Sequence, residues 1–149
     1  MFTNLENKHV EQIYNIQINN ADEFGNNIWS RAEINDLLKK KGFYSSIFIQ
    51  EKRIEGFGIF FEAGNFLDLY SLFVSPMYRK RGIATTIINC AVNHCKKNNL
   101  VKIVLEVNEK NIKALNFYIN KSFTMTGKRK NYYQLGENYF DAILMEMKI

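Results

Sequence analysis

The chain has 149 residues, of which 46% are hydrophobic and 23% are charged, as in ordinary soluble globular proteins. This composition excludes a disordered chain, and the length predicts one domain over residues 1–149 with a single core. The formal net charge of +5 fits an anionic ligand or a nucleic acid. The basic residues are spread along the chain, however, and no nucleic-acid motif accompanies them, so a nucleic-acid partner is not favoured.

Several kinds of site and location are excluded by the sequence. No stretch approaches the roughly 20 apolar residues that span a bilayer, and Met1–Glu6 lacks the basic start of a secretory signal, so we expect a cytoplasmic protein. Cys90 and Cys95 fall in one predicted helix, roughly 8–9 Å apart, too far for a disulfide. Without a tight cluster of cysteines and histidines, no metal site is expected. Of the two histidines, His9 is expected at the surface and His94 late in a helix.

The first forty residues are predicted to contain two helices. Apolar residues within 9–18 recur with the spacing of an amphipathic helix. A loop is expected over residues 21–28. Ser30 and Glu33 then form the pattern of a capping box, which predicts a second helix to about residue 40.

An antiparallel meander of three strands should follow. Residues 44–50, 54–61 and 66–74 are rich in aromatic and β-branched types, and the charged segment 51–53 separates the first two as a hairpin turn. Within the second strand, Gly56-Phe57-Gly58 indicates a bulge or close packing, because no helix follows it as a dinucleotide-binding turn requires.

The pattern changes after the meander. Residues 83–97 and 112–119 have helical apolar spacing, and 101–107 forms a compact apolar strand. Closing strands are expected over residues 123–126 and 139–147, with a loop over 131–138. The strand–helix–strand unit from 66 to 107 should cross over right-handed, with its strands parallel. The fold class is therefore α/β, with a mixed sheet of about six to seven strands, an antiparallel meander followed by a parallel pair, and helices on both faces.

The turn Arg79-Lys80-Arg81-Gly82-Ile83-Ala84 is the most informative segment. A helix N-terminus offers unpaired backbone amides to a phosphate, and a glycine lets the backbone approach it closely. The arginines add positive charge. On these residues alone, a phosphate-binding turn and an ordinary basic turn are both open.

The context of this turn adds a family resemblance. The pattern Arg-x-x-Gly-x-Ala between a strand and a helix resembles the acetyl-coenzyme A motif of the GNAT superfamily. Its second block is similar to Leu105-Glu106-Val107-Asn108 with Asn111, Ala114, Tyr118 and Phe123. The segments Arg129-Lys130-Asn131-Tyr132-Tyr133, Asp141-Ala142 and Trp29-Ser30 are similar to the bacterial ribosomal-protein-alanine N-acetyltransferases, the RimI group. The likeness is strongest over residues 66–147.

This resemblance implies a GNAT-like fold and an enzyme that transfers the acetyl group of acetyl-CoA to a primary amine. The implied acceptor is the N-terminal α-amino group of a protein such as a ribosomal protein. A lysine side chain, a polyamine or another small amine remains an alternative. A non-catalytic module that binds acetyl-CoA or nucleic acid is the alternative of another class.

The resemblance also implies roles for individual residues. Glu106 would be the general base, and Tyr118 would face the coenzyme sulfur as general acid. Ser122 stands where the family usually has glycine, so the turn there should be slightly strained. Acetyl-CoA would be held by the backbone of Leu72, Phe73 and Val74, by the turn residues Arg79, Lys80, Arg81, Gly82, Ile83, Ala84 and Thr85, and by Asn111 and Tyr118.

Each of these side chains also has a structural interpretation. Glu106 could alternate onto the solvent face of its strand, although a carboxylate on a central strand needs a partner or a task. A tyrosine on an amphipathic helix, such as Tyr118, is usually in the core. Tyr132 and Tyr133 could contact a peptide substrate or pack on the sheet. Asp141 could bind substrate or accept a structural hydrogen bond.

Overall fold

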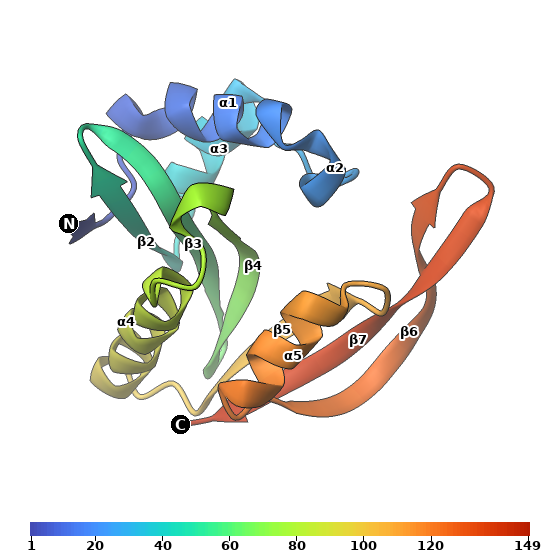
Figure 1. Ribbon diagram of the computed structural model, residues 1–149. Helices are drawn as coiled ribbons and strands as arrows, with labels where there is room; N and C mark the ends of the chain where they lie inside the picture. The colour runs from blue at the N-terminus through green and yellow to red at the C-terminus, as the bar shows by residue number, and fades with distance from the viewer.

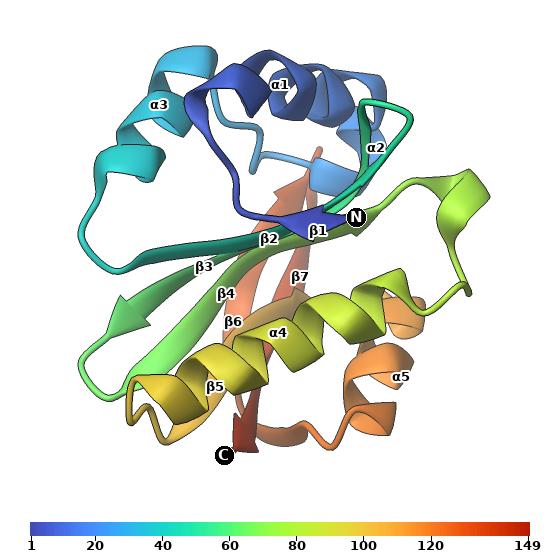
Figure 2. The same cartoon turned by 90° about the vertical axis from the view of Figure 1, so that its left-hand side faces the viewer.

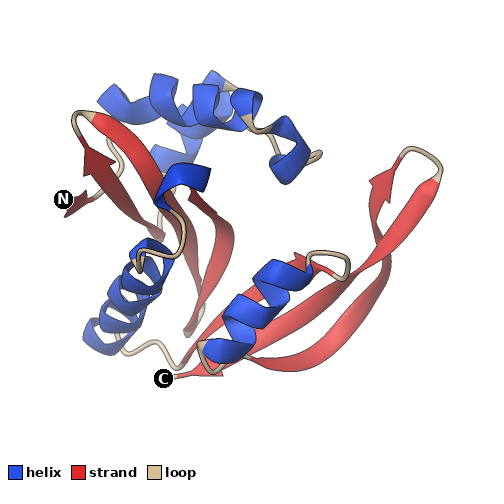
Figure 3. Ribbon diagram, viewed as in Figure 1, coloured by secondary structure: helices blue, strands red, loops and turns tan.

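The computed structural model describes residues 1–149 and contains one seven-stranded sheet (Figures 1 and 3). The strand order is β1-β2-β3-β4-β5-β7-β6, and only the β4–β5 pair is parallel. The strands are β1 (Phe2–Thr3), β2 (Phe43–Gln50), β3 (Arg53–Ala63), β4 (Phe66–Val74), β5 (Lys102–Asn108), β6 (Thr124–Leu135) and β7 (Asn138–Lys148). The predicted mixed sheet, a meander followed by a parallel pair, is confirmed.

Helices cover both faces of this sheet, as predicted (Figure 2). One face carries α1 (Val10–Asn19), α2 (Ala21–Phe24) and α3 (Arg31–Lys39). The other carries α4 (Ile83–Lys97) and α5 (Ile112–Asn120). Two 3-10 turns, Asn7–His9 and Pro76–Tyr78, precede α1 and α4. None of the helices is long and apolar enough to cross a membrane.

The predicted capping box at the start of α3 is confirmed. The Ser30 hydroxyl accepts a hydrogen bond from the Glu33 amide at 3.1 Å, and the Glu33 carboxylate accepts one from the Ser30 amide at 2.7 Å. This reciprocal pair satisfies two amides that the first turn leaves free and fixes where the helix begins.

Glycines on β3 let α4 pack close to the sheet. A Cβ at Gly58 would lie 2.5 Å from Cγ2 of Ile87, and one at Gly56 would lie 2.9 Å from Cγ2 of Ile83. Both isoleucines belong to the buried cluster between α4, α5 and the sheet. The prediction of close packing at Gly56-Phe57-Gly58 is confirmed.

A β-bulge in β4 opens the sheet near its middle. Ile59 of β3 opposes Ser71 and Phe60 opposes Leu69, so Tyr70 is an extra residue in β4. Parallel pairing with β5 ends at Leu69 and Leu105, and beyond this pair the two strands diverge (Figure 1). We call the region between residues 70–74 of β4 and 106–108 of β5 the fork.

Strand β6 differs from its prediction. A short strand over residues 123–126 and a loop over 131–138 were expected, but β6 runs to Leu135 and pairs with β7 along its length. Most of its residues are exposed, so alternation of apolar and polar residues is missing. Tyr132 and Tyr133 therefore lie in a strand.

Two further expectations concern the N-terminal half. The segment 21–28 was expected to be a loop, but its first residues form the short helix α2. His9 is 4% exposed, so its predicted surface position is wrong; its Nδ1 accepts a hydrogen bond from the Glu6 amide at 3.0 Å, which gives the buried ring a partner. Burial lowers the pKa of this imidazole, and Lys8 lowers it further. Cys90 and Cys95 are free thiols, as expected.

Candidate active site

Glu106 lies on β5 where the strand pairing ends. Its neighbours Leu105 and Val107 are buried in the cluster against α4 and α5, so alternation turns Glu106 to the opposite face. There its Oε1 lies 2.9 Å from Nε of Arg129, which comes from β6. Arg129 pairs with Ala142 of β7, and this small residue leaves room for the guanidinium to reach across to β5.

Tyr118 of α5 lies on the other face, in the buried cluster. Its ring packs edge-on against Phe117 and Phe123, with centroids 5.4 Å apart in each pair. Burial raises the pKa of its hydroxyl, and the nearby Tyr133 raises it further, so the phenol stays protonated at neutral pH. No hydrogen bond within the chain contributes to this shift.

Tyr132 and Tyr133 join the same group of residues from β6. Their rings meet edge-on, with centroids 5.1 Å apart. The charge of Glu106 raises the pKa of Tyr132, with smaller contributions from burial and from a hydrogen bond to Glu106. Burial, then Glu106, raises the pKa of Tyr133 to about 12. Tyr132 and Tyr133 thus lie near Glu106, and Tyr133 also lies near Tyr118.

Asp141 shapes the bulge that carries these tyrosines. Arg129 opposes Ala142 and Tyr133 opposes Phe140, so the strand widens over residues 130–132. The Asp141 carboxylate accepts a hydrogen bond from the Asn131 amide at 3.0 Å, and Asn131 has a φ of 53°. In this structure Asp141 is therefore engaged in holding the bulge.

The turn before α4 presents free backbone amides. The first hydrogen bond of the helix runs from the Thr86 amide to the Gly82 carbonyl at 2.9 Å, so the amides of residues 80–85 have no partner within the chain. The Arg79 amide is bonded to the Pro76 carbonyl at 3.3 Å. Lys80 and Gly82 have φ of 60° and 81°, a left-handed alternation that gathers successive N–H groups into an anion-binding concavity.

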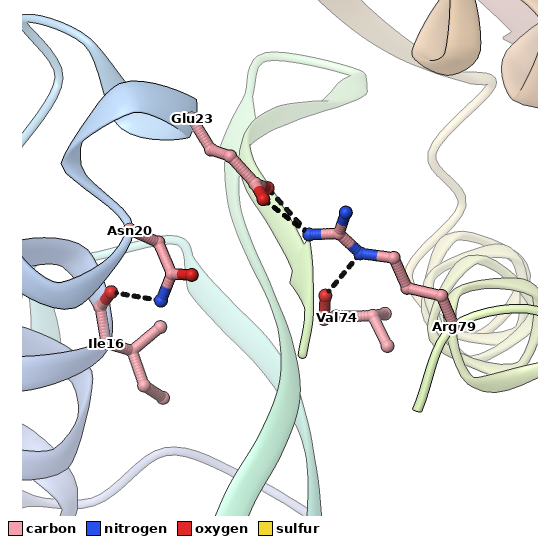
Figure 4. Close-up of polar contacts among 5 residues, drawn as sticks. All are labelled: Ile16, Asn20, Glu23, Val74 and Arg79. Carbon is pink, nitrogen blue, oxygen red and sulfur yellow. Dashed lines mark hydrogen bonds and ion pairs between the residues drawn. The ribbon is translucent and has the colours of Figure 1, made fainter. Parts of the chain in front are cut away.

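The Arg79 side chain reaches the Glu23 carboxylate and the Val74 carbonyl (Figure 4). Its Nη2 lies 2.7 and 2.8 Å from the two carboxylate oxygens of Glu23 on α2, and its Nε donates to the Val74 carbonyl at 2.9 Å. Arg79 therefore joins α2 to the end of β4. Its positive charge is already paired, whereas Lys80 and Arg81 form no salt bridge within the chain.

The other residues expected at a coenzyme lie on both sides of the fork. Leu72, Phe73 and Val74 pair with β3 but have no strand partner on the β5 side. Backbone groups on that side are free for a ligand, apart from the Val74 carbonyl. Asn111 caps α5, where its side-chain oxygen accepts from the Ala114 amide at 3.2 Å.

A cavity of about 360 Å³ also opens at the first turn of α4. It is lined by Phe2, Phe48, Gln50, Tyr78, Arg81, Gly82, Ile83 and Thr86. None of the polar residues of the fork lines this cavity, so we place the candidate proton-transfer groups at the fork and not in the cavity. The structure contains no group of three or more metal-ligating side chains.

Sequence reasoning missed two acidic residues of this region. Asp68 of β4 faces the same side as Glu106, and Glu23 holds Arg79. Burial raises the pKa of Asp68 to about 6, and the charge of Glu106 adds to the shift while Arg129 opposes it. The available signal was an aspartate inside the apolar run Phe66-Leu67-Asp68-Leu69, where a charge needs a reason.

A free-amide turn, an open strand edge, a carboxylate and a buried phenol together define a site that can hold an anionic ligand and move protons. Residues 10–123 match the model of the acetyltransferase (GNAT) family. This match covers well over half of the chain. The chain therefore belongs to the acetyltransferase (GNAT) family.

Individual relatives agree with this assignment. The [ribosomal protein bS18]-alanine N-acetyltransferase of Salmonella typhimurium is 27% identical over 81 residues, which is 54% of this chain and 55% of that relative. The chain thus matches about half the length of this relative. The crystal structure of the ribosomal-protein-S18-alanine N-acetyltransferase from Escherichia coli is similar with a TM-score of 0.87 and 21% identity, over 100% of this chain and 93% of that one. Arabidopsis thaliana NAA60 in complex with acetyl-CoA gives 0.85 and 18%, over 100% and 98%. These two likenesses show the fold.

Proposed function

We propose that this chain transfers the acetyl group of acetyl-CoA to a primary amine, and that the acceptor is the N-terminal α-amino group of a protein such as a ribosomal protein. The observation that carries the proposal is the fork. The Glu106 carboxylate of β5 lies at the fork on one face of the sheet, and the neutral Tyr118 phenol of α5 lies on the other face. The names of the relatives support the choice of acceptor.

The residues present fit acetyl-CoA. The free amides of residues 80–85 suit a pyrophosphate, and the unpaired edge of residues 72–74 suits an amide-bearing arm that runs into the fork. Lys80 and Arg81 would add charge, while Arg79 would act through its position between α2 and β4. When bound, the coenzyme supplies a thioester whose carbonyl carbon is the electrophile.

Glu106 and Tyr118 would handle protons during the transfer. The nitrogen of an α-ammonium group, whose pKa is near 8, loses one proton before it can attack and a second as the new bond forms. The Glu106 side chain is partly exposed, and it would accept a proton from the amine directly or through water. The Tyr118 hydroxyl, kept neutral by burial, holds a proton that it can give to the leaving sulfur.

The acceptor and the two roles can be tested together. At pH 7, Glu106→Gln and Tyr118→Phe should each lower kcat about a hundredfold, since a positioned acid or base contributes about 10²–10⁴-fold. The KM for acetyl-CoA should stay within about threefold of the wild type. Turnover is measured by thiol release, and the acetylated atom of a peptide mixture is located by mass spectrometry.

Two matched variants separate chemistry from packing. Glu146→Gln, on β7 and paired with Lys102, removes a carboxylate outside the fork and should leave turnover unchanged. Tyr139→Phe does the same for an exposed phenol on β7. Full activity in both Glu106→Gln and Tyr118→Phe would overturn the two roles, and acetylation of small amines only would overturn the protein acceptor.

A further inference from the structure

Asp68 is a second carboxylate beside the fork, and the roles described above leave it unused. It pairs with Val104 in the parallel ladder, and Glu106 follows Val104 on the same face of β5. From the strand spacings, the Cα atoms of Asp68 and Glu106 are roughly 8 Å apart. The two carboxylates therefore lie on either side of the last paired residues, where β4 and β5 begin to diverge.

The surroundings of the two carboxylates differ. Glu106 is paired with Arg129, whereas Asp68 is half-buried and only burial and charges, with no hydrogen bond, act on it. The charged and titratable groups on this face include Tyr70 of β4, which packs on Phe61 opposite Asp68, Glu106 of β5, Arg129 and Tyr132 of β6, Glu146 of β7 with its partner Lys102, and Lys40 at the end of α3. One free carboxylate thus remains next to one that is engaged.

The proposed reaction must take two protons from the same nitrogen. An ammonium acceptor loses the first when it becomes a neutral amine, whose lone pair can then attack. The second leaves as the new carbon–nitrogen bond forms and the carbon–sulfur bond breaks. One proton ends on the thiol of coenzyme A and the other is released to solvent, which balances the reaction.

We propose that Asp68 accepts the first of these protons, from the ammonium group of the acceptor, and that Glu106 accepts the second. The inference rests on the proposed function. Asp68 has no hydrogen-bond partner and is partly exposed, so it can receive a proton and return it to solvent. Its pKa of about 6 is closer to the pKa of an α-amino group than the pKa of an ordinary aspartate is, and this smaller difference favours the proton transfer.

Because Asp68 accepts only the first proton, the loss of kcat/KM in Asp68→Asn should depend on pH. At low pH the wild-type Asp68 is itself protonated and cannot accept a proton, and at high pH the amine arrives neutral and needs no base, so in both limits loss of the carboxylate changes little. The wild-type to variant ratio of kcat/KM should be near one at about pH 5, rise to about tenfold or more near pH 7, and fall again by about pH 9.5. The ratio for Glu106→Gln should stay high at pH 9.5, because the second proton must still be removed.

The experiment uses the full chain, saturating acetyl-CoA and a short peptide amide with a free N-terminal alanine. Asp68→Glu should restore activity near pH 7, and Asp36→Asn, on the exposed side of α3, should give a ratio of one throughout. A ratio for Asp68→Asn that is the same at every pH, as a structural role would give, would overturn the inference and leave the proposed function intact. If the wild-type chain acetylated no amine, the proposed function would fail and this inference with it.

Discussion

Asp68 carries its charge in a half-buried position without a hydrogen-bond partner, and this lowers the stability of the fold. Its pKa is about 6 in the folded chain and near 3.9 when unfolded. Well below pH 3.9 the carboxyl is protonated in both states and costs nothing. Between pH 4 and 6 the folded state binds more protons than the unfolded one, so stability falls as pH rises.

Asp68→Asn should therefore stabilise the protein at neutral pH. After solvent screening the gain should be on the order of 1–2 kcal/mol at pH 7 and only a few tenths of a kcal/mol at pH 4. Thermal melting of both proteins at the two pH values measures it, with Asp36→Asn as the control. An equal gain at both pH values would show that the effect is not electrostatic. A residue kept at a cost to stability is typical of functional positions.

At the scale of single elements, the end of α5 contains a conformational strain that one substitution can remove. Ser122 follows the helix with a φ of 70°, in the region that favours glycine. The structure thus agrees with the strain expected at this turn. Its amide donates to the Ile119 carbonyl at 3.0 Å, so the turn itself is well formed.

Ser122→Gly should raise the free energy of unfolding by about 0.5–1 kcal/mol, because glycine adopts this conformation without steric cost. For a chain of this size that is a rise in Tm of about 2 °C. Thr126→Gly, an exposed residue of β6 without a positive φ, should lower Tm instead. A loss of stability in both variants would contradict the account of the turn.

Elements with a clear period could be predicted from the sequence. Residues 66–74 and 83–97 have the same bounds in the structure as in the prediction, since apolar spacing and flanking turns mark them. Strand β6 lacks that pattern, because most of it is exposed. The contact of Arg129 with Glu106 also could not be predicted, since it crosses β7 and depends on a register that the bulge in β6 sets.

At the scale of the whole molecule, one buried cluster joins the two sides of the fork. Leu67 and Leu69 of β4 pack in the same cluster as Ile87 of α4, Leu105 of β5 and Tyr118 of α5. The backbone pairing of β4 with β5 is short, so this shared core holds the two parts of the sheet together. We therefore propose that residues 1–149 form one cooperative unit.

Calorimetry should show a single transition with equal calorimetric and van't Hoff enthalpies. Acetyl-CoA at about a hundred times its Kd should stabilise the chain by about 2.7 kcal/mol and raise this one Tm by about 5–10 °C. The control is the same titration with acetate. Two transitions, of which acetyl-CoA shifts only one, would show that the parts unfold separately.

The bulge at Tyr70 also shifts the phase of β4. In a regular strand Asp68 and Phe73, which are five positions apart, would point to opposite faces. The extra residue reverses this, so Phe73 packs beneath α1 and α3 while Asp68 shares its face. Removing Tyr70 would restore strict alternation, and with Phe73 still in its core Asp68 would turn into the apolar cluster under α4. The single inserted residue therefore lets the charged Asp68 and the buried Phe73 lie on the same face of one strand.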